Sequence, residues 1–247
     1  ILLAFLIHWL LFIPAFLFKT EKFFDLSGSL TYLSVMIYVV FSKNNFQDQT
    51  GNIVLALLII LWAVRLGSFL FFRIKKAGED KRFREIKTSF TRFFMVWTIS
   101  GMWVSLCSMC ALTAIASNNG VVLNYLFYFG LVTFFVGMSI EVISDNQKTK
   151  FRKDPKNKDR FINTGLWSRS RHPNYVGEIT LWSGVAIISF SSLEGWQYVS
   201  LISPIFTYFL LVYVSGVPQL EEGGQKKWGH IKEYQDYIKK TPSLIFK

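Results

Sequence analysis

Seven apolar stretches occupy most of this chain, and they restrict it to folds that can cross a membrane. A transmembrane helix needs about 20 mainly apolar residues to cover roughly 30 Å of hydrocarbon. The first stretch lacks a basic start and a small-residue cleavage site, so it is interpreted as a helix and not as a signal peptide. The sequence predicts an all-α membrane protein with seven transmembrane helices, of which the second and sixth are short: Ile1–Phe18, Leu26–Phe41, Ile53–Ile74, Phe93–Ser117, Val121–Ser144, Gly177–Phe190 and Tyr198–Val217.

The basic residues are distributed unevenly between the two sides of the predicted membrane domain. The chain carries 27 Lys and Arg against 16 Asp and Glu, which gives a formal net charge of +11. All of the basic residues except Lys43 and Arg65 lie in alternate connecting segments or in the C-terminal tail. Because cytoplasmic loops are enriched in Lys and Arg, we expect the N-terminus outside and the C-terminus in the cytosol. The charge is thus explained without a nucleic-acid partner.

No internal repeat is visible, and residues 1–247 are expected to form a single multi-pass domain. The host membrane is expected to be a bacterial inner membrane, or the endoplasmic reticulum if the source is eukaryotic. Cys107 and Cys110 form a C-x-x-C pair inside an apolar stretch. Without a second pair or a nearby His, small apolar packing is favoured over metal binding. No metal site is predicted.

Four charged residues lie inside or at the ends of the apolar stretches. Arg65 lies deep in its stretch, where a charge normally faces a partner or a cavity. Glu141 and Asp145 are four residues apart and share one helix face, so either Arg or ligand donors face them or they are an ordinary interfacial pair. Glu178 follows Pro173 at the start of a predicted helix. It either benefits from the helix N-terminus or faces a cavity.

Polar and aromatic residues cluster just before the sixth apolar stretch. Within eight residues the chain places Arg171, His172, Asn174, Tyr175 and Glu178. The chain lacks G-x-G-x-x-G and Walker loops, so a nucleotide can be held only by helix ends and side chains. Planar guanidinium groups before this cluster suit phosphate oxygens.

Two adjoining segments resemble the steroid 5α-reductase family, in particular its bacterial branch. Residues 141–152 read E-x-x-x-D-x-Q-K-x-x-F-R, and residues 163–178 read N-T-G-L-W-S-R-S-R-H-P-N-Y-V-G-E. The resemblance is strong over 141–178, fair in the tail and weak before Trp62. It implies seven helices around a cavity that opens to the membrane, with NADPH held at the cytosolic side.

The same resemblance implies an enzyme that transfers a hydride from NADPH to the β-carbon of an enone lipid. The substrate is expected to come from the bilayer, a Δ4-3-ketosteroid or another apolar enone. Glu178 matches a catalytic carboxylate beside the nicotinamide and substrate, and Trp62 occupies a substrate-binding position. The residues at or beside cofactor-binding positions are Arg65, Asp145, Arg152, Arg160, Arg171, His172, Asn174, Tyr175, Tyr234 and Tyr237.

Two features depart from the steroid-reducing members. Trp62 stands where those proteins have a Tyr, and their early Gln-Glu pair has no clear counterpart, since Gln47 and Asp48 fall in a predicted outer loop. Glu178 is therefore the best candidate for polarising the substrate carbonyl, where negative charge builds during hydride addition.

Two other function classes compete with the reductase. Arg171–Gly177 reads R-H-P-N-Y-V-G, and Glu221, Glu222, Trp228 and Tyr234 follow in the tail. This pattern also resembles the isoprenylcysteine carboxyl methyltransferases, which bind S-adenosylmethionine. A non-catalytic sterol-binding or scaffolding protein is the third class, and it requires the polar cluster to be inactive.

Overall fold

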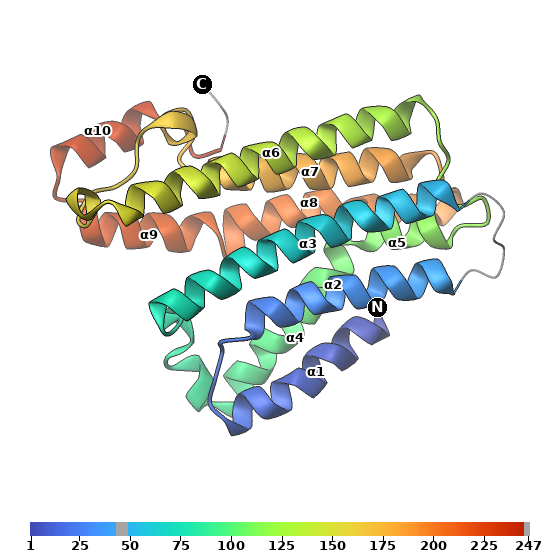
Figure 1. Ribbon diagram of the computed structural model, residues 1–247, viewed down its shortest axis with the longest axis horizontal. Helices are drawn as coiled ribbons and strands as arrows, with labels where there is room; N and C mark the ends of the chain where they lie inside the picture. The colour runs from blue at the N-terminus through green and yellow to red at the C-terminus, as the bar shows by residue number, and fades with distance from the viewer. Residues whose placement is uncertain (43–48, 245–247) are drawn as a thin grey trace. The chain divides into compact units, whose positions relative to one another are not determined.

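The computed structural model describes residues 1–42 and 49–244, so Lys43, Gln47 and Asp48 lie outside the described residues. Ten α-helices and several short 3₁₀ or π turns make up these residues, and no strand occurs among them (Figure 1). The α-helices are α1 (Leu2–Leu17), α2 (Phe24–Phe41), α3 (Thr50–Ala77), α4 (Phe90–Cys107), α5 (Met109–Ala116), α6 (Tyr125–Lys153), α7 (Pro173–Phe190), α8 (Ile202–Phe209), α9 (Val217–Trp228) and α10 (Lys232–Lys240). The predicted all-α class is confirmed for this part of the chain.

Five helical segments among the described residues are long and apolar enough to cross a membrane. They are α2, α3, α4, α6 and the largely helical stretch Gly195–Trp228, which contains α8 and α9. The shorter apolar helix α1 corresponds to the predicted span Ile1–Phe18. The helix α7 corresponds to Gly177–Phe190, but its first turns carry polar residues. These features are those of a multi-pass membrane protein.

The described residues form two compact units, each described here by itself. Unit 1 comprises residues 1–123 and 189–203, and unit 2 comprises residues 124–188 and 204–247. Every residue of the polar cluster before α7 belongs to unit 2. The expectation of a single domain stays a prediction.

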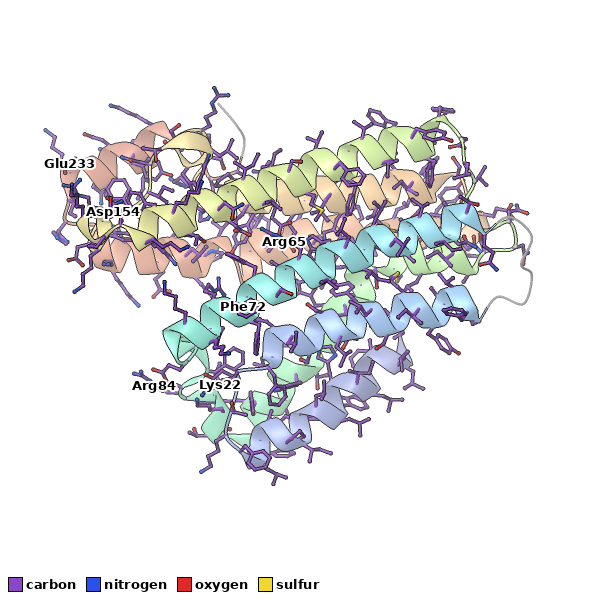
Figure 2. The ribbon with its side chains drawn as sticks, in the orientation of Figure 1. Lys22, Arg65, Phe72, Arg84, Asp154 and Glu233 are labelled. Atoms are coloured by element: carbon purple, nitrogen blue, oxygen red, sulfur yellow. The ribbon has the colours of Figure 1, made fainter. Side chains whose placement is uncertain are left out.

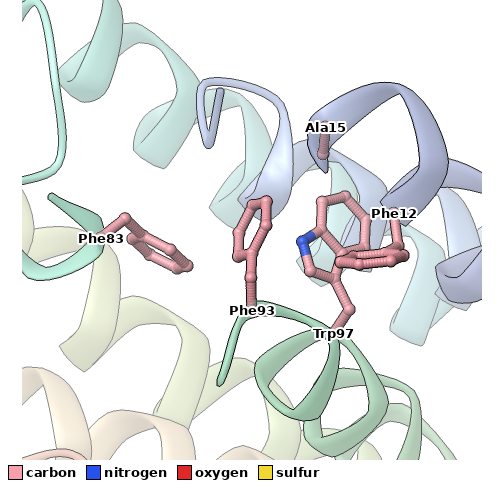
Figure 3. Packing of buried hydrophobic residues seen from close by; sticks show 5 residues of the cluster. All are labelled: Phe12, Ala15, Phe83, Phe93 and Trp97. Atoms are coloured by element: carbon pink, nitrogen blue, oxygen red, sulfur yellow. The ribbon is translucent and has the colours of Figure 1, made fainter. Parts of the chain in front are cut away.

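Unit 1 has an aromatic core between α1, α4 and the loop that follows α3. Figure 3 shows the cluster of Phe12, Ala15, Phe83, Phe93 and Trp97, all buried. The Phe93 ring lies edge-on to both Phe12 and Trp97, with centroids 5.7 and 6.0 Å apart. Such edge-to-face pairs add to the burial of apolar area, so this cluster fixes how α1 packs on α4.

The predicted span Phe93–Ser117 is not one helix, which corrects the sequence expectation. The α-helix α4 ends at Cys107 and α5 begins at Met109. The Ser108 hydroxyl donates to the Val104 carbonyl at 2.5 Å, and the Ser203 hydroxyl donates to the Cys107 carbonyl. A serine that bonds back to the i−4 carbonyl bends a helix. The C-x-x-C pair therefore straddles this break, and both cysteines are buried and form no disulfide.

Candidate functional site

The helices α6 and α7 of unit 2 pack with their backbones in contact, through glycines spaced seven residues apart on each helix. A Cβ placed on Gly137 would lie 2.6 Å from the Gly177 carbonyl oxygen, and one on Gly184 would lie 2.6 Å from the Phe134 nitrogen. Side chains on these four positions would force the helices apart. Small residues allow two membrane helices to approach each other this closely. The glycines on α6 are Gly130 and Gly137, and those on α7 are Gly177 and Gly184.

This close packing places a line of charged residues of α6 beside the start of α7. Glu141, Asp145, Lys148 and Arg152 follow one another at i, i+4, i+7 and i+11, so they share one helix face. A Cβ on Gly177 would lie 2.9 Å from the Glu141 Cβ, which turns this face toward α7. Glu141 and Asp145 are buried, with 2% and 7% of their surface exposed. The expectation that the two acids share one face is confirmed.

The loop before α7 is attached to this face of α6 by a short 3₁₀ turn, η4 (Gly165–Ser168). The Trp167 indole donates to the Ser144 carbonyl at 3.1 Å, and the Lys148 ammonium lies 4.4 Å from the centre of its ring. The Leu166 amide donates to the Gln147 side chain at 3.0 Å. A cation over an indole face is attracted by the ring quadrupole, so Lys148 and Trp167 hold the loop on α6.

The C-terminal tail is bound to the residues that precede α7. The Arg171 and His172 amides donate to the Pro242 and Ser243 carbonyls at 2.9 and 3.1 Å. Arg171 Nη2 lies 2.8 Å from Glu221 Oε1, and His172 Nε2 lies 3.2 Å from the same oxygen. We call this set of contacts the tail clasp. Arg171 and His172 thus have structural partners, which local sequence patterns do not predict because the partners are 49 to 71 residues away.

Three buried polar atoms beside the tail clasp have no hydrogen-bond partner within the described residues. They are Arg171 Nε, His172 Nδ1 and Asn174 Oδ1. Because His172 Nε2 faces the Glu221 carboxylate, we assign its proton to Nε2, which leaves Nδ1 as an acceptor. The large majority of buried side-chain polar atoms in proteins have a hydrogen-bond partner. One donor and two acceptors at the start of α7 are therefore available to a ligand or to water.

The two predicted tyrosines of the tail lie in an aromatic cluster. The Phe161 ring packs edge-on to Tyr234 at 5.0 Å and against Tyr237 at 5.3 Å. The Tyr237 hydroxyl donates to the Trp167 carbonyl at 2.6 Å. Burial raises the pKa of both Tyr234 and Tyr237, so both phenols keep their protons at neutral pH. The Trp228 indole donates to the Asp159 carbonyl at 2.7 Å and closes the cluster over the loop.

The site residues from the sequence do not all fall in one unit. Unit 2 contains Asp145, Arg152, Arg160, Asn174, Tyr175 and Glu178 together with the tail clasp and the two tyrosines. Arg160 is exposed and its side chain has no partner in the described part of the chain. Glu178 is 7% exposed and lies one turn after Asn174, on the same side of α7. The His172 and Tyr175 rings stack at 5.6 Å.

The other two predicted residues, Trp62 and Arg65, lie on α3 in unit 1, where Figure 2 labels Arg65. Trp62 is buried and packs edge-on to Tyr32 with centroids 5.3 Å apart. The Arg65 guanidinium lies 5.4 Å from the centre of the Phe69 ring. Substrate binding by Trp62 and cofactor binding by Arg65 stay predictions.

Comparisons with known proteins give one family and two distant relatives. The family described as "Protein of unknown function (DUF1295)" matches residues 11–241. A probable O-methyltransferase of Ustilaginoidea virens is 31% identical over 115 residues, which is 40% of this chain and 40% of that protein. The 3-oxo-5-alpha-steroid 4-dehydrogenase 1 of Bos taurus is 28% identical over 119 residues, 48% of this chain and 41% of that protein. The chain thus spans about two fifths of these relatives, and no solved structure matches it.

Proposed function

This chain belongs to the DUF1295 family, and we propose that it is an integral-membrane reductase that uses NADPH to reduce the C=C bond of an enone lipid. The similarity to a steroid 4-dehydrogenase supports an oxidoreductase. The cluster of buried polar groups around the start of α7 supports a ligand site there. The proposed substrate is a Δ4-3-ketosteroid or another apolar enone that enters from the bilayer.

The proposed topology has seven spans, with α1 and α7 added to the five candidate segments. It puts the N-terminus outside and the C-terminus in the cytosol, since the basic loops follow α3 and α6 and the basic tail follows α9. The Lys-rich end of α6, the tail clasp and the aromatic cluster would then lie at the cytosolic face. That side is where a soluble dinucleotide is available.

The unsatisfied atoms fit a dinucleotide. Asn174 Oδ1 and His172 Nδ1 can accept from the carboxamide or ribose hydroxyls, and Arg171 Nε can donate to an oxygen of the ligand. The guanidinium groups of Arg152 and Arg160 suit its phosphates. When bound, NADPH supplies a hydride that forms the new C–H bond at the β-carbon. The observation that carries the proposal is the set of three orphaned buried atoms beside Glu178.

Glu178 is assigned the role of polarising the substrate carbonyl. In its protonated form it donates a hydrogen bond to the carbonyl oxygen, on which negative charge builds as the hydride adds to the β-carbon. A single proton from solvent then reaches the α-carbon, so that one hydride and one proton together add across the C=C bond. Glu178 is buried, and exclusion of water strengthens the interaction between the acid and the enolate oxygen.

The first experiment separates binding from catalysis with purified protein. Glu178→Gln should abolish enone-dependent oxidation of NADPH while its NADPH affinity, measured by fluorescence titration, stays within about twofold. Glu222→Gln is the matched control, since this glutamate is exposed and pairs with the exposed Lys226. Full turnover in Glu178→Gln would remove Glu178 from the mechanism.

A second experiment tests the phosphate contacts. Arg152→Ala and Arg160→Ala should each weaken NADPH binding by about 1.5–3 kcal/mol, the scale of a hydrogen bond to a charged group. Lys153→Ala, at an exposed basic residue of the same helix end, is the control. If the NADPH affinity were unchanged in both variants, Arg152 and Arg160 would not contact the phosphates and would only mark the cytosolic side of the membrane.

The second candidate is a methyltransferase that uses S-adenosylmethionine. It is favoured by the 31% identity to a probable O-methyltransferase. The same orphaned atoms can bind the ammonium and carboxylate of that cofactor. Mass spectrometry of the small molecules released on denaturation, followed by titration with both cofactors, separates the two. Binding of S-adenosylmethionine without NADPH binding would overturn the reductase.

A further inference from the structure

The outer face of α6 carries an apolar groove that the proposed reaction does not use. Its volume is about 510 Å³, and it lies entirely within unit 2. We call it the α6 groove, and it is lined by Leu131, Val132, Phe135, Val136, Ser139, Ile140, Ile143 and Leu166. Helix α6 forms an edge of unit 2 in Figure 1. The lining residues are on the side of α6 opposite the glycines that contact α7.

The length of the groove matches one leaflet of a bilayer. Leu131 and Ile143 are twelve residues apart, which is about 18 Å along a helix. Half of a hydrocarbon core about 30 Å thick is about 15 Å. Ser139 is the one small polar residue in the lining, and it leaves depth between the larger side chains. A single acyl chain of one leaflet therefore fits the groove along α6.

Two exposed cations, Lys150 and Arg169, follow the groove residues at the Lys-rich end of α6. Lys150 follows Ile143 by seven residues, so it lies on the groove face two turns further on. Helical side chains lean toward the N-terminus, which brings the Lys150 ammonium back toward the groove. Arg169 directly follows η4 as its C-cap residue, three residues after the groove residue Leu166, so it lies at the same end of the groove as Leu166. Neither side chain has a hydrogen-bond or ion-pair partner in the described part of the chain.

We propose that the α6 groove binds one phospholipid with an anionic headgroup, its acyl chain along Leu131–Ile143 and its phosphate between Lys150 and Arg169. A second copy of the chain fits less well. Two copies related by an axis along the membrane normal would bring both pairs of cations together at the same depth, where like charges repel. The phospholipid instead neutralises them. The site needs α6 to cross a membrane but does not depend on reductase activity.

The test is lipid retention by the full-length protein, measured by native mass spectrometry. Protein stripped of lipid in detergent is mixed with equal amounts of phosphatidylglycerol and phosphatidylcholine that carry the same acyl chains. The wild type should retain one phosphatidylglycerol per copy in preference to phosphatidylcholine. Each charge reversal, Lys150→Glu or Arg169→Glu, should lower this preference by about fivefold or more, since the loss of one basic residue near an anionic surface alone has an effect of about fivefold.

Ser139→Trp tests the acyl-chain part, because the indole fills the groove and should remove retention of both lipids. The controls are Leu57→Trp and Lys75→Glu, exposed positions on α3 that should retain lipid as the wild type does. Thermal unfolding shows whether each variant is folded.

Equal retention of both lipids by the wild type, or an unchanged preference in both charge variants, would overturn the proposal. The proposal would also be overturned if the wild type were a dimer without bound lipid and Ser139→Trp made it a monomer, because the groove would then be a dimer interface. NADPH binding is measured separately, so this result is independent of the proposed reaction.

Discussion

Arg171 and Glu221 are 50 residues apart in the sequence and form an ion pair of 2.8 Å between the loop before α7 and the helix α9. The same carboxylate oxygen also contacts His172 at 3.2 Å and accepts from the Ser243 hydroxyl at 3.4 Å. One side chain thus holds together three segments of unit 2: the loop, α9 and the tail. The residues beside the orphaned atoms keep their positions through this carboxylate.

Glu221→Gln should loosen the tail clasp, because the neutral amide loses the charge that attracts Arg171. The Glu221 side chain is 39% exposed, so solvent screening limits the loss to about 1 kcal/mol of local opening free energy. Hydrogen exchange of the Arg171 and His172 amides, which donate to the tail, should become about fivefold faster. Glu222→Gln is the control, and equal exchange in the two variants would contradict the role of Glu221.

The stability of the protein should decrease as the pH falls below about 6.5, in part through His172. Burial lowers the pKa of His172, the Glu221 carboxylate opposes this, and the Lys148 and Arg171 charges add to it. The unfolded state therefore binds a proton at a higher pH than the folded state does. Between the folded-state pKa and 6.5, stability rises with pH, and it is lost as the pH falls through this window.

Thermal unfolding in detergent between pH 5 and 8 measures this effect. His172→Gln keeps an uncharged donor toward Glu221 and should flatten the dependence on pH. His230→Gln, at an exposed histidine, is the control and should keep the wild-type slope. Identical slopes for wild type and His172→Gln would show that other groups cause the acid sensitivity.

The sequence predicted the helices and the polar cluster because both depend on local patterns. Apolar runs define spans, and Asn174 and Glu178 come one turn apart whatever the rest of the chain does. The contact between Glu221 and Arg171 could not be predicted in this way, since it depends on how the tail folds back. The break at Ser108 was missed for the same reason, because Ser203 from a distant segment bonds to Cys107.

The glycine pairs of α6 and α7 are a signal in the sequence from which the packing of these two helices can be predicted. Gly130 and Gly137 are seven apart, as are Gly177 and Gly184. This spacing returns to the same helix face after two turns. Two predicted spans with this pattern are expected to pack against each other, which would have placed Glu141 beside the start of α7.

Gly177→Ala should destabilise unit 2, because its new Cβ would lie 2.6 Å from both the Glu141 nitrogen and the Gly137 carbonyl oxygen. Backbone atoms cannot rotate away, so the helices must separate at a cost of about 1–3 kcal/mol. Gly223→Ala is the control, since this glycine of α9 has nothing within 4 Å of a Cβ. Alanine there should be neutral or stabilising by up to about 1 kcal/mol. Denaturant unfolding compares the two, and equal stability would show that the helices do not touch.

Asn174→Leu should separate ligand binding from folding, since it should weaken NADPH binding without lowering the stability of the unliganded protein. Asn174 Oδ1 is buried and has no partner within the described residues, so an apolar side chain of similar size should leave the unliganded protein equally stable or stabilise it. NADPH should bind about 1–3 kcal/mol more weakly, because the donor that it presents to this oxygen loses its acceptor. Unfolding midpoints measured with and without NADPH give both quantities from one variant. If the unliganded variant lost stability, a partner within the protein would have to satisfy Asn174. If the shift produced by NADPH were unchanged, the cofactor would have to bind away from the start of α7.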